Sequence, residues 1–231
     1  MDHNTKHYTT LLLDVDGTLL DFNEAERQGV CAVMEHFGLT PSPERIHDYH
    51  EVNSGWWKAF ERGDVQRDDI FANRFHDFFA KYDLDVASSE AEPLYRSYLN
   101  SSAVLIKDAL EICAWLKERY DLYVVTNGVS TTQYKRLKDS GLDQFFTNIF
   151  VSEDTGSQKP NKEYFDYCFE RIPEKDKSKM LIIGDSLTSD IKGGKIAGID
   201  TCWMGDETQE CPEELKPDYV IRELMDLKKI L

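Results

Sequence analysis

The sequence predicts an α/β fold in which a parallel sheet carries helices on both faces. The run Leu11–Leu13 reads as a buried strand that ends abruptly in acidic and turn residues. From Lys107 onward, short apolar runs alternate with amphipathic helical segments, which is typical of a parallel sheet. Between these parts the periodicity is only helical. We therefore predict a catalytic core from residues 1–20 and 104–231, with an all-α insertion at residues 21–103.

In the predicted core, short strands alternate with helices along the chain. The helix predicted over 108–119 is amphipathic, and Gly141 ends the helix predicted over 130–140. Strands are predicted at 11–13, 122–125, 149–151, 180–183, 201–203 and near 219, and the other core helices at 161–171, 188–197 and 224–231.

The insertion is predicted to contain four helices, over residues 23–37, 46–61, 68–82 and 89–99. Because it directly follows the loop after the first strand, we expect it to act as a lid that excludes water and selects the substrate. Asn53 and Trp57 are the candidate selectivity residues, and an aromatic plane such as Trp57 would stack well on a nucleobase. Packing inside the insertion is the alternative for Trp57, and the favoured role for Trp56 and Phe60.

Composition limits the possible partners. The formal charge of −16 argues against a nucleic-acid partner, although a small phosphate ester remains possible where a cation and a few lysines reverse the local sign. No apolar run approaches the ~20 residues that span a bilayer, and the polar start lacks a secretory apolar region, so we expect a cytoplasmic protein without a membrane partner. The five cysteines form no CxxC pair, and we interpret them as reduced core residues rather than as a disulfide frame or a zinc site.

Two acids stand where the first strand ends. Asp14 and Asp16 would lie at the carboxyl edge of the sheet, where ligands bind in open parallel sheets. Two carboxylates at that position suit a divalent cation and a reaction that needs both a nucleophile and an acid. An ordinary turn is the alternative for the Asp-Val-Asp-Gly segment.

Three later segments also carry chemical groups after apolar runs. Thr126-Asn127-Gly128 offers a hydroxyl and backbone N–H groups to an anion at a helix entry, although it also reads as a simple turn with a helix cap. Lys159 precedes a helix and could fix a phosphate, whereas a solvated lysine is the default reading. In the segment Gly184–Asp190, both Asp185 and Asp190 could serve a cation, and a helix cap or an exposed position is the alternative for Asp190.

The patterns DVDGTLLD, TNG, KP and GDSxxxD, in this order, resemble the motifs of the haloacid dehalogenase superfamily of aspartate-nucleophile hydrolases. The resemblance covers essentially the whole chain. It implies a Rossmann-like core with a helical cap, and it implies Mg²⁺ as the cofactor. It assigns the nucleophile to Asp14 and the general acid and base to Asp16.

The same resemblance implies the remaining roles. Phosphate would be bound by Thr126, Asn127 and Lys159. The metal would be held by Asp14, by the backbone carbonyl of Asp16 and by Asp185. Asp190 would orient these groups or ligate the metal itself.

The second acid separates two branches of this superfamily, because haloacid dehalogenases lack it. Asp16 therefore favours a phosphatase, without excluding a phosphoglucomutase. The finer resemblance is to helical-cap pyrimidine 5′-nucleotidases, which hydrolyse nucleoside monophosphates such as dUMP, dTMP and UMP. It rests on the segments Glu51-Val52-Asn53, Trp57, the turn at Gly63, Lys159-Pro160-Asn161-Lys162, and Ala197-Gly198 through Cys202-Trp203.

We therefore expect a magnesium-dependent phosphomonoesterase that acts on a small phosphorylated metabolite, as a monomer or weak homodimer. Fold-level likeness supports the reaction class better than the substrate. The alternatives are a phosphatase for phosphoglycolate or a sugar phosphate, a phosphoglucomutase, a 2-haloacid dehalogenase, and a binding protein without turnover.

Overall fold

The computed structural model describes residues 7–205 and 211–231. It divides into two compact units. One is the helical segment Phe22–Ser102, and the other combines the described residues on either side of it. Each unit has its own hydrophobic core.

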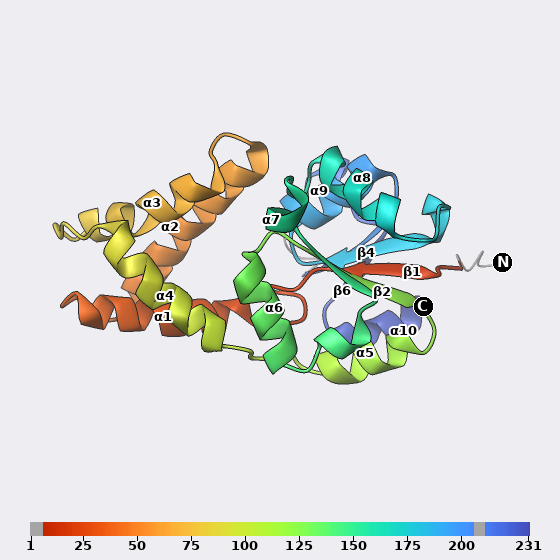
Figure 1. Cartoon of the computed structure of the whole chain (residues 1–231), viewed down its shortest axis with the longest axis horizontal. Helices are drawn as coiled ribbons and strands as arrows, with labels where there is room; N and C mark the ends of the chain where they lie inside the picture. Colours follow the sequence, from red (N-terminus) through yellow and green to blue (C-terminus); the bar gives the residue numbers. More distant parts are fainter. Residues whose placement is uncertain (1–6, 206–210) are drawn as a thin grey trace. The chain divides into compact units, whose positions relative to one another are not determined.

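The non-helical unit is organised around a six-stranded sheet in the order β3-β2-β1-β4-β5-β6 (Figure 1). All neighbouring strands are parallel. The first strand is central because it pairs with both β2 and β4, and it is completely buried. The strands are β1 Thr10–Leu13, β2 Asp121–Thr126, β3 Asn148–Val151, β4 Met180–Gly184, β5 Asp200–Met204 and β6 Tyr219–Ile221.

Helices cover both faces of this sheet, which confirms the predicted fold class. Side chains alternate between the faces, so Leu11 and Leu13 contribute to one core cluster and Leu12 to the other. The first cluster includes residues of α5 Ala109–Lys117, α6 Ser130–Asp139 and α10 Leu227–Ile230, and the second includes residues of α8 Lys162–Arg171 and α9 Lys192–Ala197. A single short turn of helix after β3, α7 Ser152–Thr155, was not predicted.

Two predicted helices are wrong in detail. The segment predicted over 188–197 begins as a π-helical turn, Leu187–Ile191, and only then continues as α9. The segment predicted over 224–231 begins as a 3-10 turn, because the Asp226 carboxylate accepts hydrogen bonds from the backbone N–H groups of Arg222 and Glu223. In both places an aspartate of the first turn accepts backbone hydrogen bonds from the residues that precede the turn.

The helical unit contains α1 Phe22–His36, α2 Pro43–Arg62, α3 Arg67–Ala80 and α4 Ser88–Ser101. Ser42 caps α2 through a bond from the Arg45 N–H, and Gly63 ends it in the left-handed region at φ 80°. The core between these helices is rich in aromatic rings, with Tyr49, Phe75 and Tyr95 in mutual contact. Within the described parts of the chain, no helix combines the length and apolar character needed to cross a membrane.

A buried polar network joins the helices of this unit. The Arg74 guanidinium donates three hydrogen bonds to Glu92, at 2.9 Å from Nε to Oε2 and at 2.7 and 2.8 Å from Nη2 to Oε1 and Oε2. Its Nη1 also donates to the Asn53 side-chain oxygen at 2.9 Å, while the Asn53 amide donates to Glu26 at 2.6 Å. Four helices are thereby tied together by groups that must stay paired, because an unpaired buried charge is costly.

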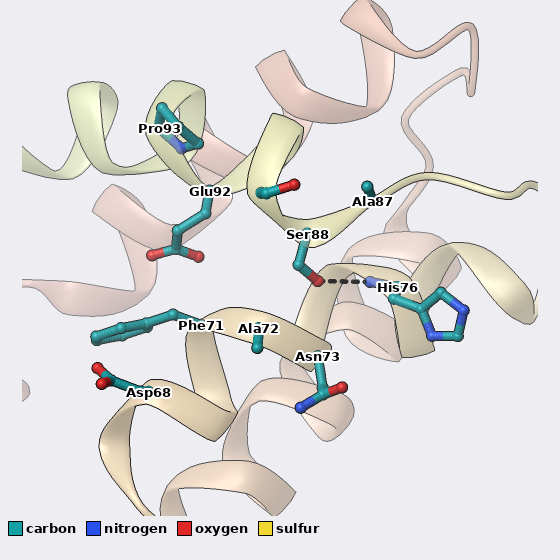
Figure 2. A pocket seen from close by; sticks show the side chains of 10 residues that line it. Asp68, Phe71, Ala72, Asn73, His76, Ala87, Ser88, Glu92 and Pro93 are labelled. Carbon is teal, nitrogen blue, oxygen red and sulfur yellow. Dashed lines mark hydrogen bonds between the residues drawn. The ribbon is translucent and has the colours of Figure 1, made fainter.

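A hollow of about 660 Å³ lies beside this network, between α3 and the start of α4 (Figure 2). Its polar groups are engaged locally, since the Ser88 hydroxyl accepts from the His76 backbone N–H at 3.0 Å. The acids that line it are Asp68 and Glu92, and Glu92 is already paired with Arg74. None of the predicted catalytic or metal residues lines this hollow, and we assign it no function.

We expect Arg74→Met to lower the free energy of unfolding of the protein. The loss should fall near the lower end of about 3–5 kcal/mol, because Glu92 loses its buried partner but keeps its bond from Arg96. Urea titration followed by circular dichroism measures the change. Arg96→Met is the matched control, and it should cost less than about 1 kcal/mol because the Arg96 side chain is 29% exposed. Equal losses in the two variants would contradict this account.

Candidate active site

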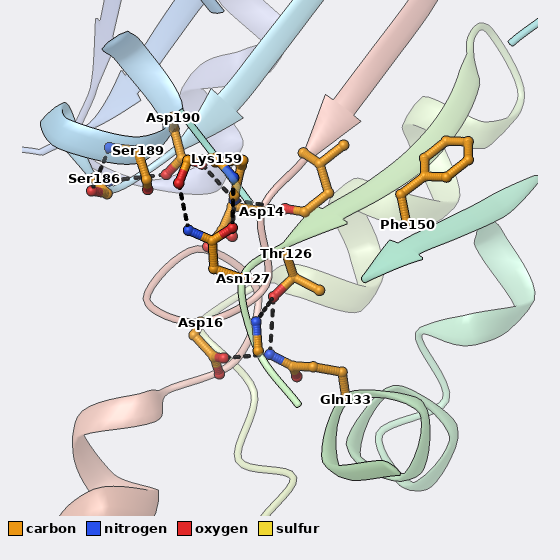
Figure 3. A network of polar contacts seen from close by, with 12 residues as sticks. Asp14, Asp16, Thr126, Asn127, Gln133, Phe150, Lys159, Ser186, Ser189 and Asp190 are labelled. Atoms are coloured by element: carbon orange, nitrogen blue, oxygen red, sulfur yellow. Dashed lines mark hydrogen bonds and ion pairs between the residues drawn. The ribbon is translucent and has the colours of Figure 1, made fainter. Parts of the chain in front are cut away.

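The predicted chemical groups gather at the carboxyl edge of the sheet (Figure 3). Leu13 of β1 pairs with Val124 of β2 and Ile183 of β4, so the residues that follow these three strands lie at one level. Asp14 is held there by a bond of 2.9 Å from its N–H to the Ile183 carbonyl. The parallel register therefore brings together segments that are far apart in the sequence.

Lys159 lies at the centre of the site, and its side chain is only 1% exposed. Its Nζ donates to Asp14 Oδ1 at 2.6 Å, to Asp190 Oδ1 at 2.7 Å and to the Val125 carbonyl at 2.7 Å. An ammonium group has three N–H donors, and all three are engaged here. Lys159 is thus a fixed positive charge rather than a solvated lysine.

Burial and neighbouring charge shift the pKa of three groups in the cluster. Burial raises the pKa of Asp14 well above its ordinary value; Lys159 opposes this shift, and Asp190 and Asp185 add to it. Burial alone would lower the pKa of Lys159, but the two carboxylates outweigh it and raise that pKa. Burial and then Asp190 raise the pKa of Asp185 to about 7. The Asp185 side chain nevertheless remains exposed, and contact with water weakens that shift.

The acidic cluster fits a divalent cation. Asp14, Asp185 and Asp190 each offer a carboxylate oxygen, and these oxygens lie within 4.8 Å of one another. When ionised, the three carboxylates face only one ammonium group, so negative charge is in excess. Oxygen donors are those that Mg²⁺ prefers, and a cation placed there would counter the repulsion that raises the acid pKa values.

Glycines leave the space that this cluster needs. Gly17 has φ +84°, and a Cβ there would lie 2.3 Å from Asp185 Oδ2. A Cβ on Gly184 would lie 2.2 Å from the Asp190 side chain. Both distances are far below van der Waals contact, so the turn after β1 and the end of β4 require glycine.

Asp190 is fully buried, which excludes the exposed position that the sequence left open for it. Its Oδ1 accepts from Lys159, and its Oδ2 accepts from the Ser186 backbone N–H at 3.1 Å. This aspartate therefore orients the lysine and the loop after β4. Direct ligation of a metal by Asp190 stays a prediction.

The amide of Asn127 holds the main chain of Lys159. Its Oδ1 accepts from the Lys159 N–H at 2.8 Å, and its Nδ2 donates to the Lys159 carbonyl at 2.9 Å. The side chain thus positions the lysine. The predicted phosphate contact through backbone N–H groups of the Thr126-Asn127-Gly128 loop stays a prediction.

Two residues that the sequence analysis did not single out contact Asp16. Gln133 Nε2 donates to Asp16 Oδ2 at 2.5 Å, and the Arg136 guanidinium forms an ion pair with Asp16 Oδ1. Both residues lie three positions apart on α6 and are buried, whereas the Asp16 side chain is 27% exposed. Their spacing on one helix face was the available signal, but polar residues on such a face usually indicate a solvated surface.

The two cap candidates differ in their surroundings. Asn53 is 2% exposed and both ends of its amide are bonded to Glu26 and Arg74, which favours a structural role. Trp57 is half-buried and makes edge contacts with Phe60 and Phe71 at ring-centroid distances of 5.8 and 6.4 Å. Substrate selectivity stays a prediction for both residues.

Comparison with known proteins identifies the family of this chain. The family model of the haloacid dehalogenase-like hydrolases matches residues 8–198, and the chain belongs to that family. It is therefore an enzyme, a hydrolase of phosphoric monoesters, and the resemblance stated from the motifs is confirmed.

Three relatives align over nearly the whole chain. YfnB of Bacillus subtilis, named as a haloacid dehalogenase-type (HAD) hydrolase, is 47% identical over 98% of this chain and 96% of its own length. The pyrimidine 5′-nucleotidase PynA of Streptococcus pneumoniae is 34% identical over 95% of this chain and 93% of its own length. The pyrimidine 5′-nucleotidase YjjG of Escherichia coli is 29% identical over 96% of each chain. A crystal structure of YfnB bound to magnesium superposes with a TM-score of 0.93 over 98% of this chain and 99% of that one.

We expect Mg²⁺ to stabilise this protein and Asp185→Asn to remove most of that effect, because the variant lacks a ligand carboxylate. At a Mg²⁺ concentration of about 100 times the dissociation constant, the gain should be roughly 2.7 kcal/mol, which differential scanning calorimetry resolves. Asp166→Asn, at an exposed acid of α8 paired with Lys162, is the control and should keep the full gain. A full magnesium-dependent shift in the Asp185 variant would exclude this residue as a ligand.

Proposed function

We propose that this enzyme is a magnesium-dependent phosphomonoesterase that acts through an aspartyl-phosphate intermediate on pyrimidine nucleoside 5′-monophosphates. The observation that carries the proposal is the buried contact of Lys159 with Asp14 and Asp190, beside Asp185 at the sheet edge. We further propose that it works in the cytoplasm, as a monomer or weak homodimer, and that the helical unit acts as a cap.

In the first half-reaction, Asp14 attacks phosphorus. Its Oδ1 is held by Lys159, which leaves Oδ2 to form the new P–O bond. The bond from phosphorus to the ester oxygen breaks, and Asp16, which must carry a proton for this step although its carboxylate pairs with Arg136 in the free enzyme, donates that proton to the departing oxygen. The Thr126 hydroxyl and the backbone N–H groups that follow it bind phosphoryl oxygens at the entry to α6.

In the second half-reaction, water attacks the phosphorus of the aspartyl phosphate. Asp16 takes the proton of that water, the bond between phosphorus and Asp14 breaks, and inorganic phosphate leaves with the carboxylate of Asp14 restored. Lys159 counters negative charge on Asp14 throughout. When bound by Asp14, the Asp16 carbonyl and Asp185, Mg²⁺ would supply positive charge against the phosphoryl oxygens.

The substrate proposal is supported by the two relatives named as pyrimidine 5′-nucleotidases, which align over more than nine-tenths of this chain. A screen of phosphorylated metabolites with Mg²⁺, read as released phosphate, tests it. Fastest turnover of dUMP, dTMP or UMP is the expected result. Fastest turnover of phosphoglycolate or a sugar phosphate would replace the nucleotide proposal and keep the phosphatase. Halide release from a chlorinated acid would argue for a dehalogenase.

We expect Asp14→Asn to abolish turnover of p-nitrophenyl phosphate, because an amide cannot form the acyl phosphate. The rate should fall to the background of the assay, while the circular dichroism spectrum stays that of the folded protein. Asp121→Asn is the control, since Asp121 is an exposed acid at the start of β2 and so at the opposite edge of the sheet. An active Asp14 variant would overturn the nucleophile assignment.

We expect Trp57→Ala to raise KM for pyrimidine monophosphates several-fold more than for phosphoglycolate, because only the nucleotide can stack on the indole. Base stacking on an aromatic side chain contributes about 1–3 kcal/mol. Trp56→Ala is the matched control, because the Trp56 indole N–H is already bonded to Asp77 at 3.0 Å. Equal effects of Trp57→Ala on both substrates would assign Trp57 to packing inside the helical unit.

A further inference from the structure

Gln133 joins two groups of the active site from the first turns of α6. Its Nε2 donates to Asp16 Oδ2 at 2.5 Å and to the Thr126 hydroxyl oxygen at 3.0 Å (Figure 3). The side chain is 1% exposed, so water does not compete for these bonds. Gln133 also lies against Gly128, where a Cβ would come within 2.2 Å of Nε2.

The surroundings determine which way the Gln133 amide points. If its oxygen and nitrogen were exchanged, the oxygen would face the Asp16 carboxylate, which offers only acceptors when ionised. The NH₂ group has two N–H donors, and in the observed orientation each one meets an acceptor, while the buried Oε1 has no hydrogen-bond partner among the described residues. The hydrogen-bond network therefore assigns the nitrogen to the side of Asp16 and Thr126.

This orientation constrains the hydroxyl of Thr126. A hydroxyl group has one donor and two acceptor positions. The Thr126 oxygen accepts from Gln133 Nε2 and from the Gly128 backbone N–H at 3.2 Å, which fills both acceptor positions. The hydroxyl hydrogen is then left to donate, and a phosphoryl oxygen is the acceptor that the proposed reaction brings to this loop.

We propose that Gln133 is a positioning residue that fixes the Thr126 hydroxyl as a donor to the phosphoryl group and orients Asp16 beside it. This inference rests on the proposed phosphatase function. Arg136, one turn further along α6, pairs with the other oxygen of Asp16. Gln133 and Arg136 thus hold Asp16 from one face of α6, and Gln133 also holds the Thr126 hydroxyl. Without Gln133, the hydroxyl can rotate and donate elsewhere, and the phosphate site loses a directed donor.

Gln133→Leu tests the inference, because leucine is similar in volume and cannot donate. We expect kcat/KM for p-nitrophenyl phosphate to fall roughly tenfold, and inhibition by inorganic phosphate to weaken by a similar factor. A simple loss of folded enzyme would lower kcat and leave the inhibition constant unchanged. Gln133→Ala provides a second variant in case leucine does not fit beside Gly128. Gln144→Leu, at an exposed glutamine, is the control and should behave like the wild-type protein.

A double-mutant cycle with Thr126→Val tests whether Gln133 acts through the hydroxyl. We expect the combined variant to lose clearly less activity than the product of the two single losses. Independent losses, or an unchanged inhibition constant for phosphate in both Gln133 variants, would overturn the inference while Asp14→Asn remains inactive. An active Asp14→Asn variant would instead overturn the proposed function, and this inference with it.

Discussion

The ion pairs of Lys159 with Asp14 and Asp190 are the constraint on which the rest of the site depends. They join the loop after β1, the segment before α8 and the π-helical turn after β4; Lys159 is 145 residues from Asp14 and 31 residues from Asp190 in the sequence. Because all three groups are buried, losing one leaves an uncompensated charge, which costs far more than losing an exposed pair. The same contacts that hold this edge together also place the proposed nucleophile.

The order of the strands makes this meeting possible. With β1 between β2 and β4, the loops after all three strands open at one edge, and none of them has to cross the sheet. The Asn127 amide then fixes the main chain of Lys159 from the neighbouring loop, and Asp190 fixes its side chain. Lys159 is thus held by two side chains that take no part in the proposed bond changes, which keeps the geometry of the site before the substrate binds.

The sequence predicted the parts of this site that are encoded locally. An apolar strand followed at once by Asp14, or by Gly184 and Asp185, marks a strand end whatever the rest of the chain does. It could not predict Gln133 and Arg136, because a polar residue on a helix has the same pattern whether it meets water or a buried carboxylate. It also could not assign partners to the amides of Asn53 and Asn127, since an amide that holds a neighbouring side chain or backbone and one that binds a ligand look alike in sequence.

A formal charge of −16 repels an anionic phosphate substrate, so the site itself must supply the attraction. The positive charge of Lys159 is already shared between two carboxylates, and that of Arg136 is taken up by Asp16. Neither side chain therefore offers the phosphate an uncompensated charge. In the proposed reaction, attraction must come from directed donors, namely the Thr126 hydroxyl and backbone N–H groups, and from a divalent cation among the carboxylates. In the proposed reaction, the site therefore carries a net attraction for phosphate only when the divalent cation is bound among its carboxylates.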